Sequence, residues 1–275
     1  MPEFDRSTPL TVALKAQRGK VDITAEERST ALVEIVPLDG SDASRQAADD
    51  ATVTLEGDTL AIRPRESAGW GWRRSPNLLI TVKVPLDSTI AVQAASADLR
   101  AVGRFAQAQV NLSSGDAYVE DVTGDAHVEA ASGDLTVRRV GGALRMKSSS
   151  GDLEVGDVTG DVSVEAASGG ITLRSAASSL RAETASGDIE IGVVREGESR
   201  IRSASGDVKV GVAAGTGVWL DVNTASGSTR NELTMGTDTP GASAASTGAK
   251  LELRIRTASG DVEIRRFAGA FPTAA

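Results

Sequence analysis

Apolar and polar residues alternate along most of the chain, and the alternation repeats with a period of about 18 residues. The repeat is marked by the tripeptide Ser-Gly-Asp. Its central position falls at Gly115, Gly133, Gly151, Gly169, Gly187, Gly206, Gly227 and Gly260, with Ala97 in the same register one period earlier. The successive spacings, counted from Ala97, are 18, 18, 18, 18, 18, 19, 21 and 33. A nearly constant spacing of this size is typical of a repeat protein.

Aligning the copies on this position gives columns of constant chemistry. Ser precedes it in all nine copies, and an acidic residue follows it in seven. Apolar residues such as Leu135 and Val137 come next, with a polar residue between them, and another apolar column, such as Val128, lies four residues before the Ser. A second turn signal, such as Val122-Thr123-Gly124, follows nine residues later. Each unit therefore predicts two short strands, each with one buried face, and two turns.

One such unit is too small to bury its own apolar face, so the copies are expected to stack, with equivalent strands paired in parallel. The predicted fold is all-β: a single-chain parallel β-solenoid of about nine rungs of 18 residues, with an irregular β region at the N-terminus. Residues 91–266 form the regular solenoid in this interpretation.

Residues 1–90 follow the pattern only loosely and are interpreted as degenerate rungs or an N-terminal cap. Segments 19–23 and 57–62 look like degraded rungs, and 79–84 looks like a strand that ends at Pro85. Residues 267–275 are the predicted C-terminal cap or tail, in which Phe267 and Phe271 are placed to fold over the last rung.

Composition fits stacked rungs and excludes several classes of function. Aromatic residues make up only 3% of 275, as expected of an interior too narrow for many rings. The net charge of −9 argues against nucleic acid and anionic membrane surfaces as partners. The absence of Cys excludes disulfides, thiol nucleophiles and Cys-ligated zinc. Without a signal peptide or an apolar run long enough to span a bilayer, the expectation is a cytoplasmic location and no membrane insertion.

The sequence predicts no catalytic, cofactor-binding or metal site, and hence no enzyme. His127 is the only His, and it precedes inward-facing Val128, so it is expected to face solvent. Stacked Asp residues resemble calcium-binding β-rolls, but each rung here offers only one regular Asp. Turn capping is therefore the favoured role, and calcium binding is the alternative. The predicted turn ladder comprises Ser114, Gly115, Asp116, Ser132, Gly133, Asp134, Ser150, Gly151, Asp152, Ser186, Gly187 and Asp188.

Two of the three Trp residues lie together in a Gly-rich loop that also carries two Arg residues, namely Trp70, Trp72, Arg73 and Arg74. Trp beside Arg suits stacking and hydrogen bonding to a protein or a glycan, which makes this loop a candidate partner contact. The alternative is that the indoles plug the open end of the solenoid.

These columns give the chain a family resemblance. The repeated A-S-G-D-[LIV]-x-[VI] units, the segment 80–85 before the first regular rung and the terminal segment 256–264 resemble the bacterial putative-adhesin family, a β-strand-repeat domain of unknown function. The resemblance covers roughly residues 75–266. It implies a parallel β-solenoid without known catalysis, often tied to the cell envelope or its stress responses, and it defines no functional residues.

The leading hypothesis is a non-enzymatic scaffold or protein-interaction module with an unknown protein or glycan partner. One alternative is a protein that binds or cleaves carbohydrate, indicated by the Trp loop and the surface carboxylates. Another is a homo-oligomer or filament assembled through the open solenoid ends, because unpaired strand edges favour association.

Overall fold

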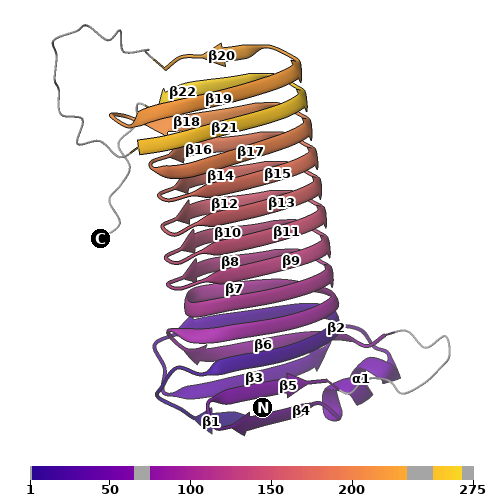
Figure 1. The fold of residues 1–275 in the computed structure, drawn as a ribbon. Coiled ribbons are helices and arrows are strands. Elements are labelled where there is room, and N and C mark those ends of the chain that lie inside the picture. The colour runs from indigo at the N-terminus through magenta and orange to yellow at the C-terminus, as the bar shows by residue number, and fades with distance from the viewer. Residues whose placement is uncertain (1, 65–74, 234–249, 268–275) are drawn as a thin grey trace, which may run out of the picture.

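The computed structural model describes residues 2–64, 75–233 and 250–267. These residues form 22 strands and one helix, stacked as rungs along one axis (Figure 1). The predicted all-β parallel solenoid is therefore confirmed. The N-terminal elements are β1 (Glu3–Asp5), β2 (Thr11–Glu26), β3 (Thr30–Pro37), α1 (Asp42–Asp49), β4 (Thr52–Glu56), β5 (Thr59–Arg63) and β6 (Asn77–Pro85).

The remaining strands build the repeated rungs and the C-terminal end. They are β7 (Ser88–Ser114), β8 (Ala117–Val122), β9 (Ala126–Ser132), β10 (Leu135–Val140), β11 (Leu144–Ser150), β12 (Leu153–Val158), β13 (Val162–Ser168), β14 (Ile171–Ala176), β15 (Leu180–Ser186), β16 (Ile189–Val194), β17 (Gly197–Ser205), β18 (Val208–Ala213), β19 (Gly217–Ser226), β20 (Thr229–Asn231), β21 (Lys250–Ser259) and β22 (Val262–Phe267).

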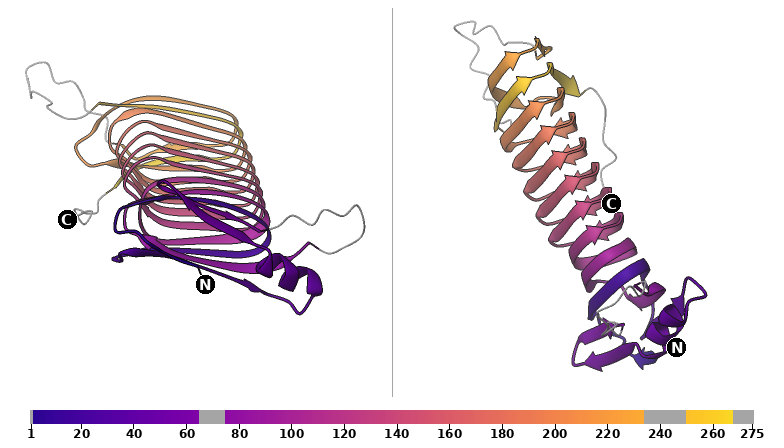
Figure 2. Two further views of the ribbon diagram at one scale, coloured as in Figure 1. Left: turned by 90° about the horizontal axis from the view of Figure 1, so that it is seen from below. Right: turned by 90° about the vertical axis from the view of Figure 1, so that its right-hand side faces the viewer.

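The sequence period is the rung of the solenoid. Leu135 pairs in parallel with Ala117 on one side and with Leu153 on the other, and each partner lies one repeat away along the chain. Seen from below, the rungs overlie one another as flattened rings (Figure 2). The strands divide into two opposing faces. The first face runs β8, β10, β12, β14, β16, β18, β22, β20, and the second runs β9, β11, β13, β15, β17, β21, β19.

Side chains alternate between a dry interior and the surface. The inward columns are Val, Ile, Leu and Ala, and equivalent residues such as Val119 and Val137 are fully buried. One ring does enter the described core: Phe105 is 0% exposed and lies beside Val122 of the next rung. A narrow interior therefore limits rings, as expected, but does not exclude them.

The N-terminal region contains two rungs that continue the solenoid and a cover over its end. Strand β2 is in register with β7, with Gly19 opposite Ala97, and β5 and β6 both pair in parallel with β2. Beyond them β3, β1 and β4 pair antiparallel, and α1 lies at the same end (Figure 1). In the segment 57–62, interpreted as a degraded rung, Gly57 lies in the turn of the antiparallel β4–β5 hairpin, and residues 59–62 belong to β5, which pairs in parallel with β2.

The helix α1 was not predicted from the sequence. It begins at Ser41, whose hydroxyl accepts a hydrogen bond from the backbone N–H of Ser44, the usual N-cap arrangement. Its eight residues fall well short of a bilayer, and no helix in the described ranges is long and apolar enough to cross one.

The C-terminal rungs do not stack in chain order. Ser205 pairs with Ser259, and Ser259 in turn pairs with Ser226, so the rung of β21 and β22 is inserted between its two predecessors. In Figure 1 yellow β21 lies between orange β17 and β19. Phe267 is consequently the last residue of a strand in the penultimate rung, which corrects its predicted place over the final one. Phe271 lies outside the described residues.

One inward position holds a polar residue between two Leu residues. Ser199 pairs with Leu180 and Leu253, is 0% exposed, and its hydroxyl has no partner among the described residues. Because a buried hydroxyl without a partner costs about 1 kcal/mol or more, Ser199→Ala should raise the free energy of unfolding by about 1 kcal/mol. Urea denaturation measures this change. The matched control is Ser148→Ala, which removes a donated hydrogen bond of 3.0 Å to Ser150 and should destabilise; equal effects would contradict the argument.

An ion pair fixes the start of β7. Arg104 Nε and Nη2 lie 2.7 and 2.8 Å from the two carboxylate oxygens of Asp87, and this hydrogen bonding holds the pKa of Asp87 below its ordinary value. A lowered folded-state pKa gives stability that is present above the unfolded-state pKa, about 3.9, and is lost as pH falls through the folded-state pKa.

Asp87→Asn should therefore lower the stability measured in urea at pH 7 by a few tenths of a kcal/mol at most, because both side chains are part-exposed. The difference from the unmutated protein should shrink as the pH falls below about 4. Urea midpoints at pH 7, 5, 4 and 3 measure it, with exposed Asp5→Asn as the control. A stability difference between the variant and the unmutated protein that grows at low pH would contradict this prediction.

Candidate functional site

The predicted turn ladder is a set of hydrogen bonds between rungs, interrupted where Gly170 takes the place of an Asp. The Asp116 carboxylate accepts from the backbone N–H of Asp134 at 2.9 Å, and Asp134 accepts from that of Asp152 at 2.8 Å. Asp152 and Asp188 accept in the same way from Gly170 and Asp207. Backbone N–H groups are thus the donors that face the stacked carboxylates, and each Asp secures the corner of the next rung.

The same contacts occupy carboxylate oxygens that calcium would need. At the end of the ladder, the backbone N–H of Ser228 and then its hydroxyl lower the pKa of Asp261. Across residues 2–64, 75–233 and 250–267, no three or more His, Asp or Glu residues are grouped as metal ligands. The hydrogen bonds of these carboxylates are those of turn capping.

Glycine is required at the corner for two reasons. Gly151 has φ +127°, a conformation that residues with a Cβ rarely adopt. A Cβ there would also lie 2.1 Å from the carbonyl oxygen of Gly133 in the preceding rung. Gly133, Gly115 and Gly187 have the same sign of φ and a similarly close approach to their preceding rung. These predicted residues therefore shape the backbone at the corner and allow the rungs to approach closely.

Outward charges on the second face form a chain of ion pairs through the C-terminal half. Lys147 Nζ lies 3.9 Å from Glu165, and Arg181 lies 2.9 Å from Glu183. Arg202 lies 3.0 Å from the same Glu183, and further along the axis Arg254 reaches Glu198 at 3.6 Å. His127, predicted to face solvent, is part-exposed on this face with Nε2 3.1 Å from Glu129. These polar side chains are thus largely paired with one another.

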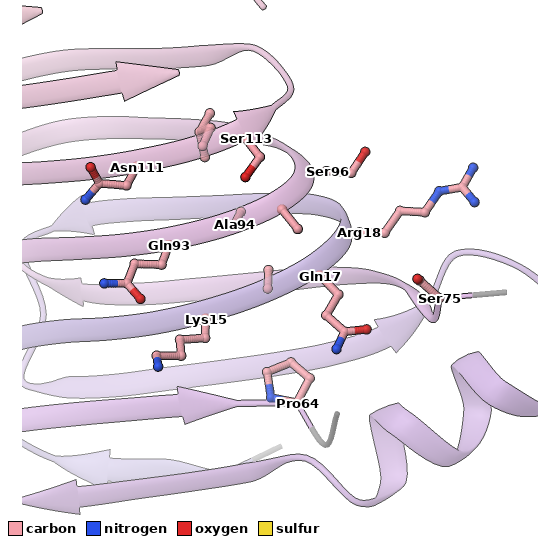
Figure 3. Close-up of a pocket in the computed structure, with 13 residues that line it drawn as sticks. Lys15, Gln17, Arg18, Pro64, Ser75, Gln93, Ala94, Ser96, Asn111 and Ser113 are labelled. Atoms are coloured by element: carbon pink, nitrogen blue, oxygen red, sulfur yellow. The ribbon is translucent and has the colours of Figure 1, made fainter. Parts of the chain in front are cut away.

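At its N-terminal end, the second face carries a groove of about 1030 Å³ over β2 and β7 in place of the ion pairs. We call this feature the amide groove. Its polar side chains come from neighbouring strands and point outward (Figure 3). Strand pairing sets Lys15 opposite Gln93, and Asn111 follows Gln93 one repeat later. The polar lining residues are Lys15, Gln17, Arg18, Ser75, Gln93, Ser96, Asn111 and Ser113.

The polar side chains of the amide groove are free to meet a ligand. The hydrogen bonds and ion pairs of the described residues include none from the side chains of Lys15, Gln17, Gln93 or Asn111. Among the described residues, the groove lining contains no Asp or Glu. Primary amides both donate and accept hydrogen bonds. The groove is therefore a rigid array of donors and acceptors on a sheet face, with positive charge at one end.

The predicted contact residues Trp70, Trp72, Arg73 and Arg74 lie outside the described residues. Pro64 and Ser75, which bound that segment, line the amide groove. The third Trp was overlooked from the sequence: Trp219 on β19 is 56% exposed, and the Arg254 guanidinium lies 5.6 Å from its ring centroid. Alternation could have found it, because it lies between apolar Val218 and Leu220.

The amide groove was also missed from the sequence. Gln93 and Asn111 each lie four residues before the central position of a repeat, Ala97 and Gly115. If Gly19 is taken as a further central position, Lys15 joins the same outward column, and this column was the available signal. The N-terminal segment lacks Ser-Gly-Asp, so nothing in its sequence alone placed β2 beside β7 rather than elsewhere.

Comparison with solved structures gives similarity along nearly the whole length. The chain is similar to a putative cell adhesion protein of Clostridium sporogenes, with 9% identity, 96% of this chain and 99% of that chain covered and a TM-score of 0.22. A putative adhesin of Bacteroides fragilis gives 10% identity, coverage of 96% and 95%, and a TM-score of 0.30. One of Parabacteroides merdae gives 9%, coverage of 96% and 94%, and 0.29.

No curated protein matches the chain. The model of one family does, the one described as Toastrack DUF4097, and it matches residues 12–265. That match includes β2, so the family spans the N-terminal rungs as well as the regular ones. The predicted resemblance to a β-strand-repeat domain family of unknown function is confirmed by this match. The chain belongs to the Toastrack DUF4097 family.

Proposed function

We propose that this adhesin-like solenoid is a non-enzymatic scaffold that binds a glycan in the amide groove. The observation that carries the proposal is the contrast along one face. Outward polar groups are largely ion-paired from Lys147 onward, whereas Lys15, Gln17, Gln93 and Asn111 have no protein partner among the described residues.

The chemistry of the groove suits a hydroxyl-rich chain. Sugar hydroxyls both donate and accept, and so do the amides of Gln17, Gln93 and Asn111. Gln93 and Asn111 lie on adjacent rungs about 4.8 Å apart, and Gln17 lies on the neighbouring strand β2. Because the backbone is fixed in the sheet, binding needs only side-chain ordering. A flat, repetitive array of this kind fits a repetitive polymer better than a compact metabolite.

Binding without cleavage is the form of the proposal that the lining supports. Most glycoside hydrolases use two carboxyl groups beside the scissile bond, and the described lining of the amide groove has none. Incubation of the protein with its bound glycan, followed by a reducing-end assay, should give no turnover. Sustained release of reducing ends would show that the carbohydrate-cleaving alternative is right.

A glycan array that carries neutral and uronic-acid polysaccharides tests the proposal. The protein should bind at least one of them, and the double variant Gln93→Ala/Asn111→Ala should lose most of that signal. Asn223→Ala is the matched control, because it removes an exposed amide in the same column at the far end of the face. An empty array, or equal loss in the control, would refute a role for the groove.

Self-association is a second candidate function, and the difference between the two ends of the solenoid indicates which end would take part. Strand β19 pairs only with β21 among the described strands, and its inward residues Val218, Leu220 and Val222 are only half-buried. The other end carries short antiparallel strands and α1, which protect sheet edges from pairing. Two copies could therefore join through the end that carries β19 and β20, as a closed dimer with two-fold symmetry in which β19, the longer strand, supplies most of the contact.

Sedimentation velocity across a concentration series measures this association. We expect monomer and dimer and no longer species, and Val222→Lys should abolish the dimer by placing charge on the edge. Val53→Lys, a half-buried position on the outermost strand β4 of the protected end, should leave the dimer intact. Filaments, or monomer at every concentration, would refute the dimer.

A further inference from the structure

The amide groove has an excess of positive charge that the protein does not neutralise. Lys15 and Arg18 belong to its lining, and Arg63 ends the strand that pairs with β2 one rung further out. The register of β2 and β5 runs from Thr11 opposite Thr59 to Leu14 opposite Ile62, so Lys15 and Arg63 are the next stacked pair. We propose that the amide groove takes a carboxylate-bearing glycan; this inference rests on the proposed function.

Stacked like charges are unfavourable unless an opposite charge lies between them. On the same face further along, Lys147, Arg202 and Arg254 are paired with Glu165, Glu183 and Glu198, which offset their charge. At Lys15 and Arg63 no carboxylate is within ion-pair distance among the described residues. Hydrogen bonds from Ser41 lower the pKa of Asp39, and the positive charge of Arg18 adds to this effect. The Asp39 carboxylate is thus already occupied by Ser41. An anionic ligand would supply the missing charge.

The positive charge of the amide groove contrasts with the negative net charge of the whole chain. The chain carries a net charge of −9, so an acidic polymer is repelled from most of its surface. In the amide groove, Lys15 and Arg18 lie together, and the part of the lining that the structure describes has no acidic residue. Electrostatic steering would thus direct an acidic chain to this groove, and Arg18 and Arg63 can each hold a carboxylate by two parallel hydrogen bonds.

A glycan is favoured over an acidic peptide because of the position of the groove. Extended peptides gain affinity by adding a strand to a sheet edge, whereas β2 and β7 lie inside the stack and already pair on both sides. The described lining also has no aromatic pocket that could hold a peptide anchor or stack a nucleic-acid base. Amides and hydroxyls remain, and these match sugar hydroxyls.

Calorimetric titration with a matched pair of ligands tests the inference. The probes are oligogalacturonate and the same oligomer with its carboxyl groups methyl-esterified, which differ in charge and keep the sugar backbone. We expect the acid form to bind about tenfold more tightly, and this advantage to fall as salt rises. Lys15→Gln/Arg63→Gln should reduce acid binding about tenfold and leave the ester unchanged.

The control is Lys147→Gln, which lies in the same column and is ion-paired with Glu165. It should leave the affinity for both probes unchanged. A thermal melt checks folding: Lys15→Gln should leave the melting temperature unchanged or raise it, because it relieves repulsion between stacked cations.

The outcomes separate the two claims. Equal binding of acid and ester through Gln93 and Asn111 would overturn the charge inference and leave the glycan proposal standing. Binding of neither probe, together with an empty glycan array, would overturn both. Equally tight binding of poly-glutamate at Lys15 and Arg63 would overturn the choice of a glycan in favour of an acidic peptide.

Discussion

Gly151→Ala should be among the most damaging single substitutions in the regular rungs, with a cost of about 4 kcal/mol or more. Two independent terms add at this corner. The backbone angle of φ +127° costs a residue with a Cβ about 1–2 kcal/mol. The new methyl group would also lie 2.1 Å from the Gly133 carbonyl oxygen, and that oxygen belongs to the backbone of the preceding rung and has little room to move.

Three further glycines separate these two terms. Gly215 has φ +79° with nothing near its Cβ position, and Gly156 meets the Arg138 carbonyl oxygen at 1.9 Å without a positive φ. Gly217 has neither problem. Circular dichroism during urea denaturation should rank the Ala variants with Gly151 worst, Gly215 near about 1–2 kcal/mol and Gly217 near zero. A Gly151 variant as stable as the Gly217 variant would mean that the rungs are not stacked as described.

Phe105→Ala should destabilise the protein by about 3–5 kcal/mol. Its ring is 0% exposed and lies at the first regular rungs, where the register of β7 and β8 shifts between Ala101 and Arg104. Removing it would leave a cavity between stacked strands that pair on both sides and cannot easily close. The free energy of unfolding from urea titration measures this loss.

Two variants control for this cavity argument. Phe105→Leu keeps most of the volume and should cost less than about 1.5 kcal/mol. Tyr118→Ala removes an aromatic ring from the surface of the next rung, where Arg100 lies 5.1 Å from the ring centroid, and should cost about 1 kcal/mol or less. A Tyr118 variant as damaging as the Phe105 variant would place the core elsewhere.

The regular rungs could be predicted from the sequence because their information is local and repeated. Each copy of Ser-Gly-Asp carries its own turn chemistry, and the period-2 columns on either side define which face is buried. The pairing of Leu135 with Leu153 follows directly from equal positions in the repeat. The corner role of Asp116 and Gly133 follows from the same chemistry.

The order of the rungs at the ends could not be predicted. The units around Gly206, Gly227 and Gly260 have the same columns, so any of them can stack on any other, and only tertiary packing decides that the Gly260 rung is inserted. The same holds for β2, which precedes β5, β6 and β7 in the chain and yet lies between β7 and the rung of β5 and β6.

The amide groove escaped prediction for a related reason. Outward positions carry no packing constraint, so Lys15 and Gln93 resemble ordinary solvent-facing residues until the fold sets them side by side. What distinguishes them is the absence of protein partners among the described residues, and that is a property of the three-dimensional arrangement. The sequence therefore predicts the inward-facing positions more clearly than the function of the outward-facing ones.

The central claim is that this face binds its ligand at the N-terminal rungs, and side-chain amide resonances test it most directly. In ¹H–¹⁵N spectra of the labelled protein, adding the glycan that binds most tightly on the array should shift the amide groups of Gln17, Gln93 and Asn111. The amide of Asn223, in the same column at the far end, should not move. Shifts at Asn223 without shifts in the groove would contradict the account.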